Sequence, residues 1–499
     1  MRFEFLFSHK KYFLPYTTIM NIFGDLEKNL NYLKQTLKSD DVVFMPFTVG
    51  RTKAFIVFIS DIVDKQQISE FIIKPLKLCT KTPKNSTELK KIFLSPDLKE
   101  VPSLKDCITE IVTGSTLLFY EKSKTAFSFS LKKFEKRAIT EPPTSTVIKG
   151  PREGFVESLQ VNVSLMRRKL QSPSLKFINM KIGKYSSTAV SICYVKGIAD
   201  ENLVHTLKEK LSKIDIDAVL DSSYVSKFLG EHKRSIFKQV GNTEKPDILT
   251  AKILEGRVAI FVDGSPIALT VPYLLIEDFQ SPSDYYASSY SATVYRIIRI
   301  VSVMLSLFLP SFYVASELFH LQFIPLSFLL TIENSIKGIP LSPSYEIFFT
   351  LLIFEILNEA SVRMPKYVGM VVSIVGGLVL GETAVNAGII SAPTLMIIAF
   401  SGICLYTAPE LVQTFSLLRF LLLVVAGSLG GYALLCTMLI ILIYLVSFES
   451  YNAPICAPFS PLIKQDLKDG IYKGFLVGQK LRPLSLSNKN KVRIKENDN

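Results

Sequence analysis

The chain has 499 residues, 48% of them hydrophobic, and a formal net charge of +13 at neutral pH. A chain of this length has room for more than one domain. Its Lys and Arg residues are scattered without the basic, aromatic-bearing face of a nucleic-acid binder, so no nucleic acid is expected as a partner. Six cysteines without CxxC spacing and four histidines without ligand spacing predict neither a metal site nor another cofactor.

Hydropathy changes along the chain and predicts four segments. Residues 1–140 and 141–290 alternate short apolar clusters with polar residues, 291–450 are mainly apolar with few charges, and 451–499 are polar and basic. We therefore expect a first soluble α/β subdomain, then a linker helix with a second one. A transmembrane helical domain and a basic cytoplasmic tail are expected to follow.

Two stretches of the N-terminal half resemble copies of one unit. Each is predicted to form an apolar strand, a short loop containing Asp and an amphipathic helix: KAFIVFISDIVDKQQISEFIIKP (53–75) and AVSICYVKGIADENLVHTLKEKL (189–211). Asp64 and Asp200 occupy equivalent places in the two copies. We expect each of them to cap the N-terminus of the helix that follows.

A second pair of stretches follows at nearly the same offset. IVTGSTLLFYEKSKTAFSFS (111–130) and ILEGRVAIFVDGSPIALTVP (253–272) both contain a Gly, an apolar strand, a polar turn and another strand. Asp263-Gly264 between strands is a strong hairpin signal. The fold class predicted is α/β plus membrane α-helical: two tandem small α/β subdomains, each with a small mixed sheet, followed by a polytopic transmembrane helix bundle.

The two subdomains are predicted to join near residues 140–152, which are rich in Pro, Gly and Thr. A helix is expected over 153–170, because apolar residues recur there at intervals of three and four. Arg167 and Arg168 lie in its last turn, where cations suit the helix dipole. Two interpretations remain open: a contact with the other subdomain, with a partner or with acidic lipid, or a solvated helix end.

The C-terminal half contains six apolar stretches, and a full crossing needs about 20 apolar residues. Only the fourth and the last are long enough alone, and the first becomes adequate if Arg296 and Arg299 snorkel at its start. The stretches are 300–316, 321–332, 347–356, 367–390, 393–406 and 417–448. Basic loops and the basic tail place both ends in the cytoplasm, so the number of crossings is even. Four crossings are favoured and six are the alternative; the last stretch is one long helix or two helices broken at its glycines.

Carboxylates within apolar segments are costly, so they usually face a bundle interior, water or a partner charge. The candidates are Glu317, Glu333, Glu346, Glu355, Glu359, Glu382 and Glu410. Pairing within one helix is the simpler interpretation for Glu355, Glu359 and Arg363. Glu382 stands centrally in GGLVLGETAVNAG and is the best candidate for lining an aqueous path.

Two functions are possible for the helix that carries Glu382. Ser373, Glu382, Thr383 and Asn386 form a face that suits the lining of a pore in a ring of subunits. The same helix has small residues at three- and four-residue spacing, which suit close helix packing: Gly376, Gly377, Gly381 and Gly388. Packing is the commoner role of such faces.

Motifs of familiar enzymes are missing from the sequence. GxxxxGK[ST], GxSxG, HExxH and GxGxxG do not occur, so ATP-driven transport and most familiar enzyme chemistry are unsupported. We expect the chain not to be an enzyme.

Several segments resemble the A subunit of GerA-type spore germinant receptors. They run in family order from about residue 150 to 475. They are GPREGFVESLQVNVSLMRRKLQSPSLK (150–176), KIDIDAVLDSSYVSKFL (213–229), KPDILTAKILEGRVAIFVDGSPIALTVP (245–272), FQSPSDYY (279–286), LPSFYVA (309–315), FEILNEASVRMP (354–365), VGMVVSIVGGLVLGETAVNAGIISAP (368–393) and APFSPLIKQDLKDG (457–470). The combination is specific, whereas the first 140 residues fit the family only in pattern.

The resemblance implies a subunit of a nutrient receptor in the spore inner membrane that triggers germination. Its implied partners are a transporter-like B subunit that binds the germinant, a lipoprotein C subunit, membrane lipid and further copies of the chain. The implied activity is an oligomeric germinant-gated ion channel. A non-conducting scaffold that organises the receptor is the alternative.

Overall fold

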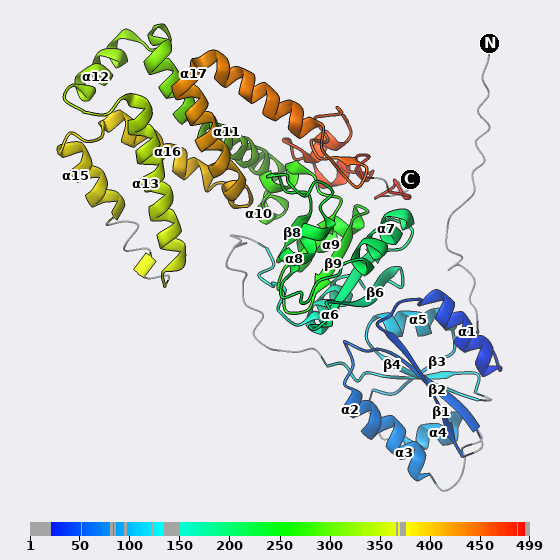
Figure 1. Ribbon diagram of the computed structural model, residues 1–499. Helices are drawn as coiled ribbons and strands as arrows, with labels where there is room; N and C mark the ends of the chain where they lie inside the picture. Colours follow the sequence, from blue (N-terminus) through cyan, green and yellow to red (C-terminus); the bar gives the residue numbers. More distant parts are fainter. Residues whose placement is uncertain are drawn as a thin grey trace, which may run out of the picture.

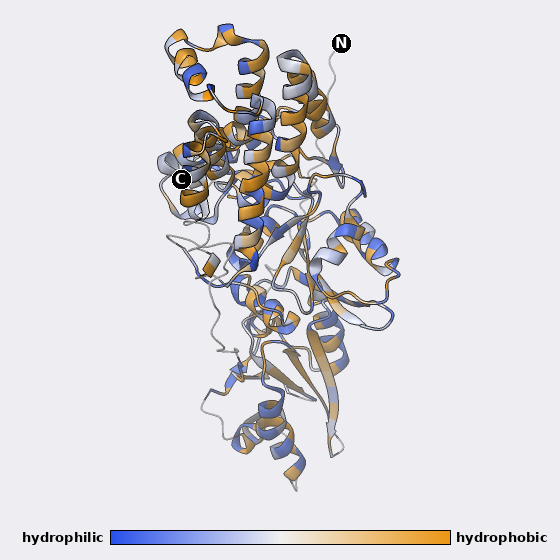
Figure 2. Ribbon diagram, turned by 60° about the vertical axis from the view of Figure 1, so that its left-hand side comes forward, coloured by the Kyte–Doolittle hydropathy of each residue, from blue (hydrophilic) through white to orange (hydrophobic). Residues whose placement is uncertain are grey.

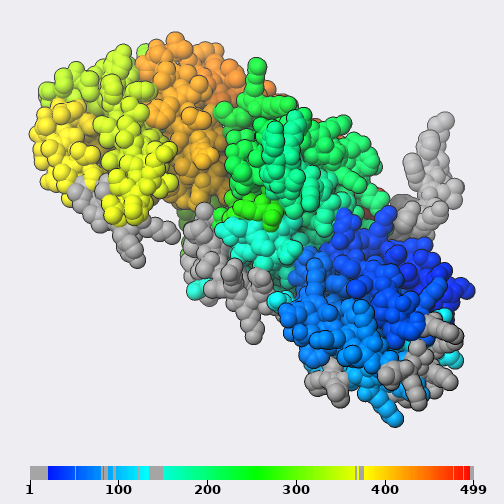
Figure 3. All heavy atoms as spheres, turned by 60° about the horizontal axis from the view of Figure 1, so that its bottom comes forward, coloured from blue at the N-terminus to red at the C-terminus, as the bar shows by residue number. Residues whose placement is uncertain are grey.

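The computed structural model describes residues 21–50, 52–79, 83, 86–93, 97–121, 123–133, 150–365, 368–369, 376–486 and 488–494. Figure 1 shows two α/β subdomains followed by a group of long helices. In Figure 3 the second subdomain lies between the first subdomain and the helices. The expected joint at 140–152 falls mostly outside the described residues.

The first subdomain has a five-stranded sheet in the order β1-β2-β4-β5-β3. Strands β2 and β4 are buried on both faces, because alternate residues enter two cores that lie on opposite sides of the sheet. The elements are α1 (Leu26–Thr36), β1 (Val42–Val49), β2 (Thr52–Ile59), α2 (Lys65–Ile68), the π-helical η1 (Ser69–Ile73), α3 (Lys74–Leu78), α4 (Ser86–Ile92), β3 (Lys99–Val101), α5 (Leu104–Val112), β4 (Thr116–Tyr120) and β5 (Ala126–Phe129).

The second subdomain repeats this arrangement. Its sheet has the order β6-β7-β9-β10-β8, which is the order of the first sheet when strands are matched along the chain. Its elements are α6 (Leu159–Lys169), β6 (Leu175–Ile182), β7 (Thr188–Val195), α7 (Glu201–Ser212), α8 (Ser222–Leu229), β8 (Gly241–Thr243), α9 (Pro246–Leu254), β9 (Val258–Val262) and β10 (Ala268–Val271).

Local features of the predicted repeat are confirmed. The side chain of Asp64 accepts a hydrogen bond from the backbone of Gln66, and that of Asp200 from Asn202, at the starts of α2 and α7. The hairpins β4–β5 and β9–β10 are both present. The expectation of mixed sheets was wrong, because every pair among the described strands is antiparallel. The connection from β2 to β4 contains helices and the edge strand β3, and it returns the chain in the opposite direction.

The helix expected over 153–170 begins later, at α6. Asn162 prevents an earlier start: its side chain accepts from the Val156 N–H at 2.9 Å and donates to the Val156 carbonyl at 2.6 Å. Asn29 of α1 holds Phe23 in the same way, at 2.9 and 2.7 Å. The pair of asparagine clamps is a further repeat of the two subdomains, and it fixes the extended segment that enters each first helix.

The helical part follows the second subdomain and begins with two short helical elements. Figure 2 shows that its long helices are mainly apolar. The elements are η2 (Leu275–Phe279), α10 (Pro282–Tyr286), α11 (Ser289–Phe319), η3 (Leu321–Phe323), α12 (Leu326–Ile336), α13 (Pro343–Arg363), the π-helical η4 (Gly376–Leu380), α15 (Gly381–Asn386), α16 (Ala392–Leu405), η5 (Pro409–Leu411) and α17 (Val412–Val446).

Two helices of the described chain are long and apolar enough to cross a membrane, Ser289–Phe319 and Pro409–Val446. The expectation that the first apolar stretch is too short alone was therefore wrong, since its helix extends over 31 residues. Snorkelling of Arg296 was also wrong, because this side chain is buried and ion-paired. The expected span at 367–390 lies partly outside the described residues.

Helix α17 is broken at Gly430, whose φ of 79° and ψ of −171° are not helical. The break lies against Phe319 at the end of α11. Both ends of α17 reach the same loop of the second subdomain: Thr414 donates to the Ile236 carbonyl at 3.1 Å, and the rings of Phe448 and His232 stack edge to face. Of the two alternatives for the last stretch, the structure therefore shows two helical arms that meet at a glycine.

The C-terminal segment folds back onto the second subdomain and contains β11 (Glu449–Ser450), β12 (Ala453–Pro454), η6 (Asp466–Asp469) and η7 (Leu476–Gly478). Ser450 accepts from the Tyr273 N–H at 3.1 Å. Arg482 and Asn488 donate to the carbonyls of Leu254 and Glu255 at the end of helix α9, at 2.7 and 3.0 Å. The described part of the predicted basic tail is thus a packed element.

Candidate functional site

The predicted pore-lining face lies on the outside of the single chain. Glu382, Thr383 and Asn386 are exposed side chains of α15, and the hydroxyl of Thr383 donates to the carbonyl of Val379. Ser373 lies outside the described residues. An exposed polar face on an apolar helical part needs water or a neighbouring chain beside it. Pore lining therefore stays a prediction, which only an assembly of chains can test.

The predicted helix-packing glycines divide into two pairs. A Cβ on Gly376 would lie 3.2 Å from Leu357 of α13, and one on Gly381 would lie 3.1 Å from Leu395 of α16. Gly377 and Gly388 have no heavy atom of the described residues within 4 Å of such a Cβ. The first pair lies at contacts within the chain, whereas the second pair faces outward.

Arg167 lies between the two α/β subdomains. Its guanidinium donates to both carboxylate oxygens of Asp41, at 2.7 and 2.9 Å, and 2% of Arg167 and 1% of Asp41 are exposed. Arg168 instead pairs with Glu153 of its own subdomain at 2.6 Å and is partly exposed. Buried in this way, Arg167 has no free guanidinium for a lipid headgroup.

Further contacts surround this pair. The ammonium of Lys176 donates to the Thr36 carbonyl at 2.9 Å, and the Asn179 N–H donates to Asp40 at 2.8 Å. Burial, followed by the charge of Arg167, lowers the pKa of Lys176 to about 8. The subdomain interface is therefore polar and closely paired, which favours a fixed relative orientation.

A second buried ionic network joins the start of α11 to the C-terminal segment. Arg296 is 1% exposed and pairs with Asp284 at 3.1 Å and with Asp469 at 3.0 Å. Arg299 pairs with Asp284 at 3.2 Å, and Lys473 donates to the Asp284 carbonyl. Residues 284–299 and the C-terminal segment, which are far apart in sequence, are thus tied together where the second α/β subdomain meets the helices.

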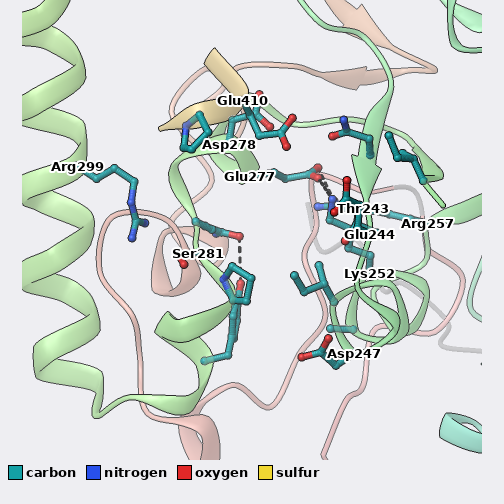
Figure 4. Close-up of a pocket in the computed structure, with 18 of the residues that line it drawn as sticks. Thr243, Glu244, Asp247, Lys252, Arg257, Glu277, Asp278, Ser281, Arg299 and Glu410 are labelled. Carbon is teal, nitrogen blue, oxygen red and sulfur yellow. Dashed lines mark hydrogen bonds and ion pairs between the residues drawn. The ribbon is translucent and has the colours of Figure 1, made fainter. Parts of the chain in front are cut away.

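A cavity of about 460 Å³ lies at the same junction. Figure 4 shows Arg299 of α11 on one side of it and Glu277 with Lys252 and Arg257 on the other. Glu277 pairs with Lys252 at 2.6 Å and also with Arg257. Burial raises the pKa of Glu277, but the charges of Arg257 and Lys252 outweigh burial and hold that pKa below its usual value.

The roof of the cavity also joins the second α/β subdomain to the helices. Lys238 pairs with Glu410, just before α17, at 2.8 Å and with Asp278 at 3.2 Å. Burial lowers the pKa of Lys238, but these two carboxylates outweigh burial and raise it. Because Lys238, Lys252 and Arg257 at this cavity each pair with a carboxylate, the arrangement suits mechanical coupling between the second α/β subdomain and the helices.

Two further predicted carboxylates lie on α13. Glu359 pairs with Arg363 at 2.6 Å, as expected for one helix. Glu355 instead reaches α17, where it accepts from Ser416 at 2.8 Å and lies 3.7 Å from Arg419. Sequence reasoning did not connect these groups, nor Arg296 with Asp284 and Asp469. The only sequence signal for that network was the presence of Asp284 in FQSPSDYY and of Asp469 in APFSPLIKQDLKDG, two of the family-like segments.

Comparison with known proteins gives a consistent result. A family model described as Bacillus/Clostridium GerA spore germination protein matches residues 30–485. Spore germination protein KA of Bacillus subtilis (strain 168) is 34% identical over 477 residues, 94% of this chain and 88% of that protein. Spore germination protein GerQA of Bacillus cereus is 31% identical over 471 residues, 94% of each chain.

One solved structure is also similar to part of the chain. The crystal structure of the N-terminal domain of the A subunit of the Bacillus megaterium spore germinant receptor GerK3 is 27% identical, and it covers 52% of this chain and 98% of that domain with a TM-score of 0.39.

Proposed function

Because this chain belongs to the GerA family of spore germination proteins, we propose that it is the A subunit of a nutrient receptor in the spore inner membrane. Several copies form an ion channel that opens when a germinant binds to the receptor. Its partners are a transporter-like B subunit that binds the germinant, a lipoprotein C subunit and membrane lipid. The chain performs no enzymatic reaction and needs no cofactor.

The junction supports this proposal most directly. Ion pairs link this part of the chain to two long helices: buried Arg296 of α11 pairs with Asp284 and with Asp469 of the C-terminal segment. Lys238 of the second α/β subdomain pairs with Glu410, just before α17, in a partly exposed contact. A movement of the soluble part would therefore be transmitted to two long apolar helices. A channel that opens on ligand binding has a closed and an open state, and the ligand must bind the open assembly more tightly. Contacts of this kind would couple that change to the helices.

The described helices favour more than four crossings: α11, α13, α16 and the two arms of α17 account for five, and both chain ends on the cytoplasmic side require an even number, which gives six. Both ends of α17 contact the second subdomain, so its two arms account for an outward and a returning crossing. Helices α13 and α16 run side by side from the region of α17's break, since Ser344 donates to the Gly427 carbonyl and Glu346 accepts from Ser391. Under this proposal the soluble part and the C-terminal segment both lie on the cytoplasmic side.

The test is the ion conductance of the receptor. The chain is expressed with its presumed B and C subunits, and current across a bilayer is recorded with and without candidate nutrients. Glu382→Ala is compared with Glu333→Ala, which changes an exposed carboxylate of α12. We expect a nutrient-triggered current that Glu382→Ala alters and Glu333→Ala preserves. A current insensitive to Glu382→Ala would remove that residue from the pore, and an intact complex without current would favour the scaffold.

A further inference from the structure

Glu346 is a buried carboxylate at the start of α13, with 1% of its surface exposed. One of its oxygens accepts hydrogen bonds from the N–H and the hydroxyl of Ser391, at 2.7 and 2.6 Å, where helix α16 begins. Its other oxygen is buried and has no hydrogen-bond partner among the described residues. One oxygen of Glu346 is thus hydrogen-bonded by the protein, and the other is available to a ligand.

Glu317 of α11 lies beside Glu346. Both of its carboxylate oxygens are buried and make no hydrogen bond of standard geometry within the described chain, and the hydroxyl of Tyr313 is the polar group within hydrogen-bonding reach of them. Its electrostatic neighbours are Glu346 and Tyr313, which lies one helical turn earlier on α11. The hydroxyl of Tyr313 is also buried, lies near Thr394, and makes no hydrogen bond of standard geometry to a described residue.

No described basic side chain forms an ion pair with either carboxylate. Arg419, the buried cation of α17, is paired with Glu355. His320, three residues after Glu317, packs against Phe323 and lies beside Gly431. Two adjacent carboxylates that are buried without a counter-charge cost several kcal/mol per ion. Some positive species must therefore offset their charge.

The break of α17 lies close to these groups. Gly430 packs on Phe319, two residues after Glu317, and Gly427 approaches Ser344, two residues before Glu346. Carbonyls beside a break lose their partners within the helix, and such unwound backbone coordinates cations in other membrane proteins. At 1.5 Å per residue, Glu317 lies about 27 Å along α11 from Arg299. The two carboxylates are thus at the opposite end of the helices from the ionic junction.

We propose that Glu317 and Glu346 bind a hard metal cation, of the alkali or alkaline-earth class, with the Tyr313 hydroxyl as a neutral ligand. Carboxylate, hydroxyl and carbonyl oxygens are the ligands such cations prefer. Only the role of this site rests on the proposed channel. In that channel it would bind ions at the membrane face opposite the α/β subdomains. Cation binding itself is independent of conduction.

The test uses the full chain in lipid nanodiscs, with its thermal unfolding as the readout. Choline is exchanged for K⁺, Na⁺, Ca²⁺ or Mg²⁺ at constant ionic strength, because a cation that binds only the folded chain raises the Tm in a saturable way. We expect one of these cations to do so. Glu317→Gln and Glu346→Gln should each weaken its apparent affinity by at least about tenfold, in line with the loss of a charged ligand. The alkali and alkaline-earth arms identify which class binds.

Controls keep the proposal falsifiable. Glu333→Gln, which neutralises an exposed carboxylate of α12, should titrate like the wild type. If a Glu variant fails to fold, Tyr313→Phe takes its place, because it removes the hydroxyl ligand with little change in packing. The proposal is overturned if no cation raises the Tm more than choline, which would mean that a shared proton offsets the charge. It is equally overturned if Glu317→Gln or Glu346→Gln titrates with the apparent affinity of the wild type. Cation binding without conductance would disprove the channel and leave this site in place.

Discussion

Two adjacent arginines at the end of α6 should differ sharply in their importance. Arg167 is buried against Asp41 of the other subdomain, so Arg167→Ala leaves that carboxylate buried and unpaired. Removing one partner of a buried pair costs about 3–5 kcal/mol. We therefore expect Arg167→Ala to lower the free energy of unfolding by about that amount, measured by urea denaturation of the chain in nanodiscs.

Arg168→Ala is the matched control. Its pair with Glu153 is partly exposed, and such pairs contribute about 0–1 kcal/mol. Equal effects of the two substitutions would contradict the assignment of Arg167 to the subdomain interface.

Lys176, at the same interface, should make stability depend on alkaline pH. Its pKa is about 8 in the folded chain, against an ordinary value of 10.5, because burial and Arg167 disfavour its charged form. Between these two values the unfolded chain binds more protons, so the free energy of unfolding rises with pH. Below pH 8 both states are protonated and the penalty of burial is fully present. Lys176→Met should flatten the rise of the urea midpoint between pH 8 and 10.5. If the midpoint of the variant rises with pH as steeply as that of the wild type, Lys176 is not the group responsible.

At the scale of elements, the break in α17 depends on one glycine. The backbone of Gly430 lies in a region that is essentially open to glycine alone, and a Cβ there would lie 3.0 Å from the ring of Phe319. We expect Gly430→Ala to destabilise the chain by about 1–3 kcal/mol, observed as a lower Tm in nanodiscs. Gly377→Ala is the control, because Gly377 has no described neighbour within 4 Å of such a Cβ and Ala favours a helix. A Tm of Gly430→Ala equal to that of Gly377→Ala would argue against the break.

The elements that sequence reasoning predicted are those with local causes. The caps of Asp64 and Asp200 and the two hairpins follow from a few adjacent residues. The asparagine clamps were missed, although Asn29 and Asn162 stand six residues after Phe23 and Val156 in both subdomains. Extending the comparison of the two copies toward the N-terminus would have found them. The sheet pairing was mispredicted because apolar strands buried on both faces do not reveal their direction.

At the scale of the whole molecule, the parts that sequence reasoning missed are held by partners far apart in the chain. Arg296 was expected to reach water, because a cation at the edge of an apolar segment usually does. It pairs instead with Asp284 and with Asp469. Asp469 is 173 residues away, and nothing local identifies it. The Glu382 face could be proposed from composition, but a single chain leaves it exposed. Its role depends on neighbours that no sequence pattern of this chain specifies.

The ionic junction predicts that the C-terminal segment is held in place by Arg296. Arg296→Gln removes the charge that pairs with Asp284 and Asp469, and leaves Asp284 buried beside Arg299 alone. We expect the C-terminal segment to detach from α11, because its Asp469 loses the buried cation with which it pairs there. Limited proteolysis of the chain in nanodiscs should then cleave after Lys464 or Lys468 at least about tenfold faster than in the wild type, since cleavage follows the population of the open form.

Lys489→Gln is the control for this experiment, because it changes an exposed cation of the same segment whose partner Glu201 is also exposed. It should leave the cleavage rate unchanged. If Arg296→Gln is cleaved as slowly as the wild type, the segment is held by its hydrogen bonds to the second subdomain, such as that of Arg482 to the Leu254 carbonyl. Movements of the soluble part would then reach α11 through η2 and α10, the short elements that precede it in the chain.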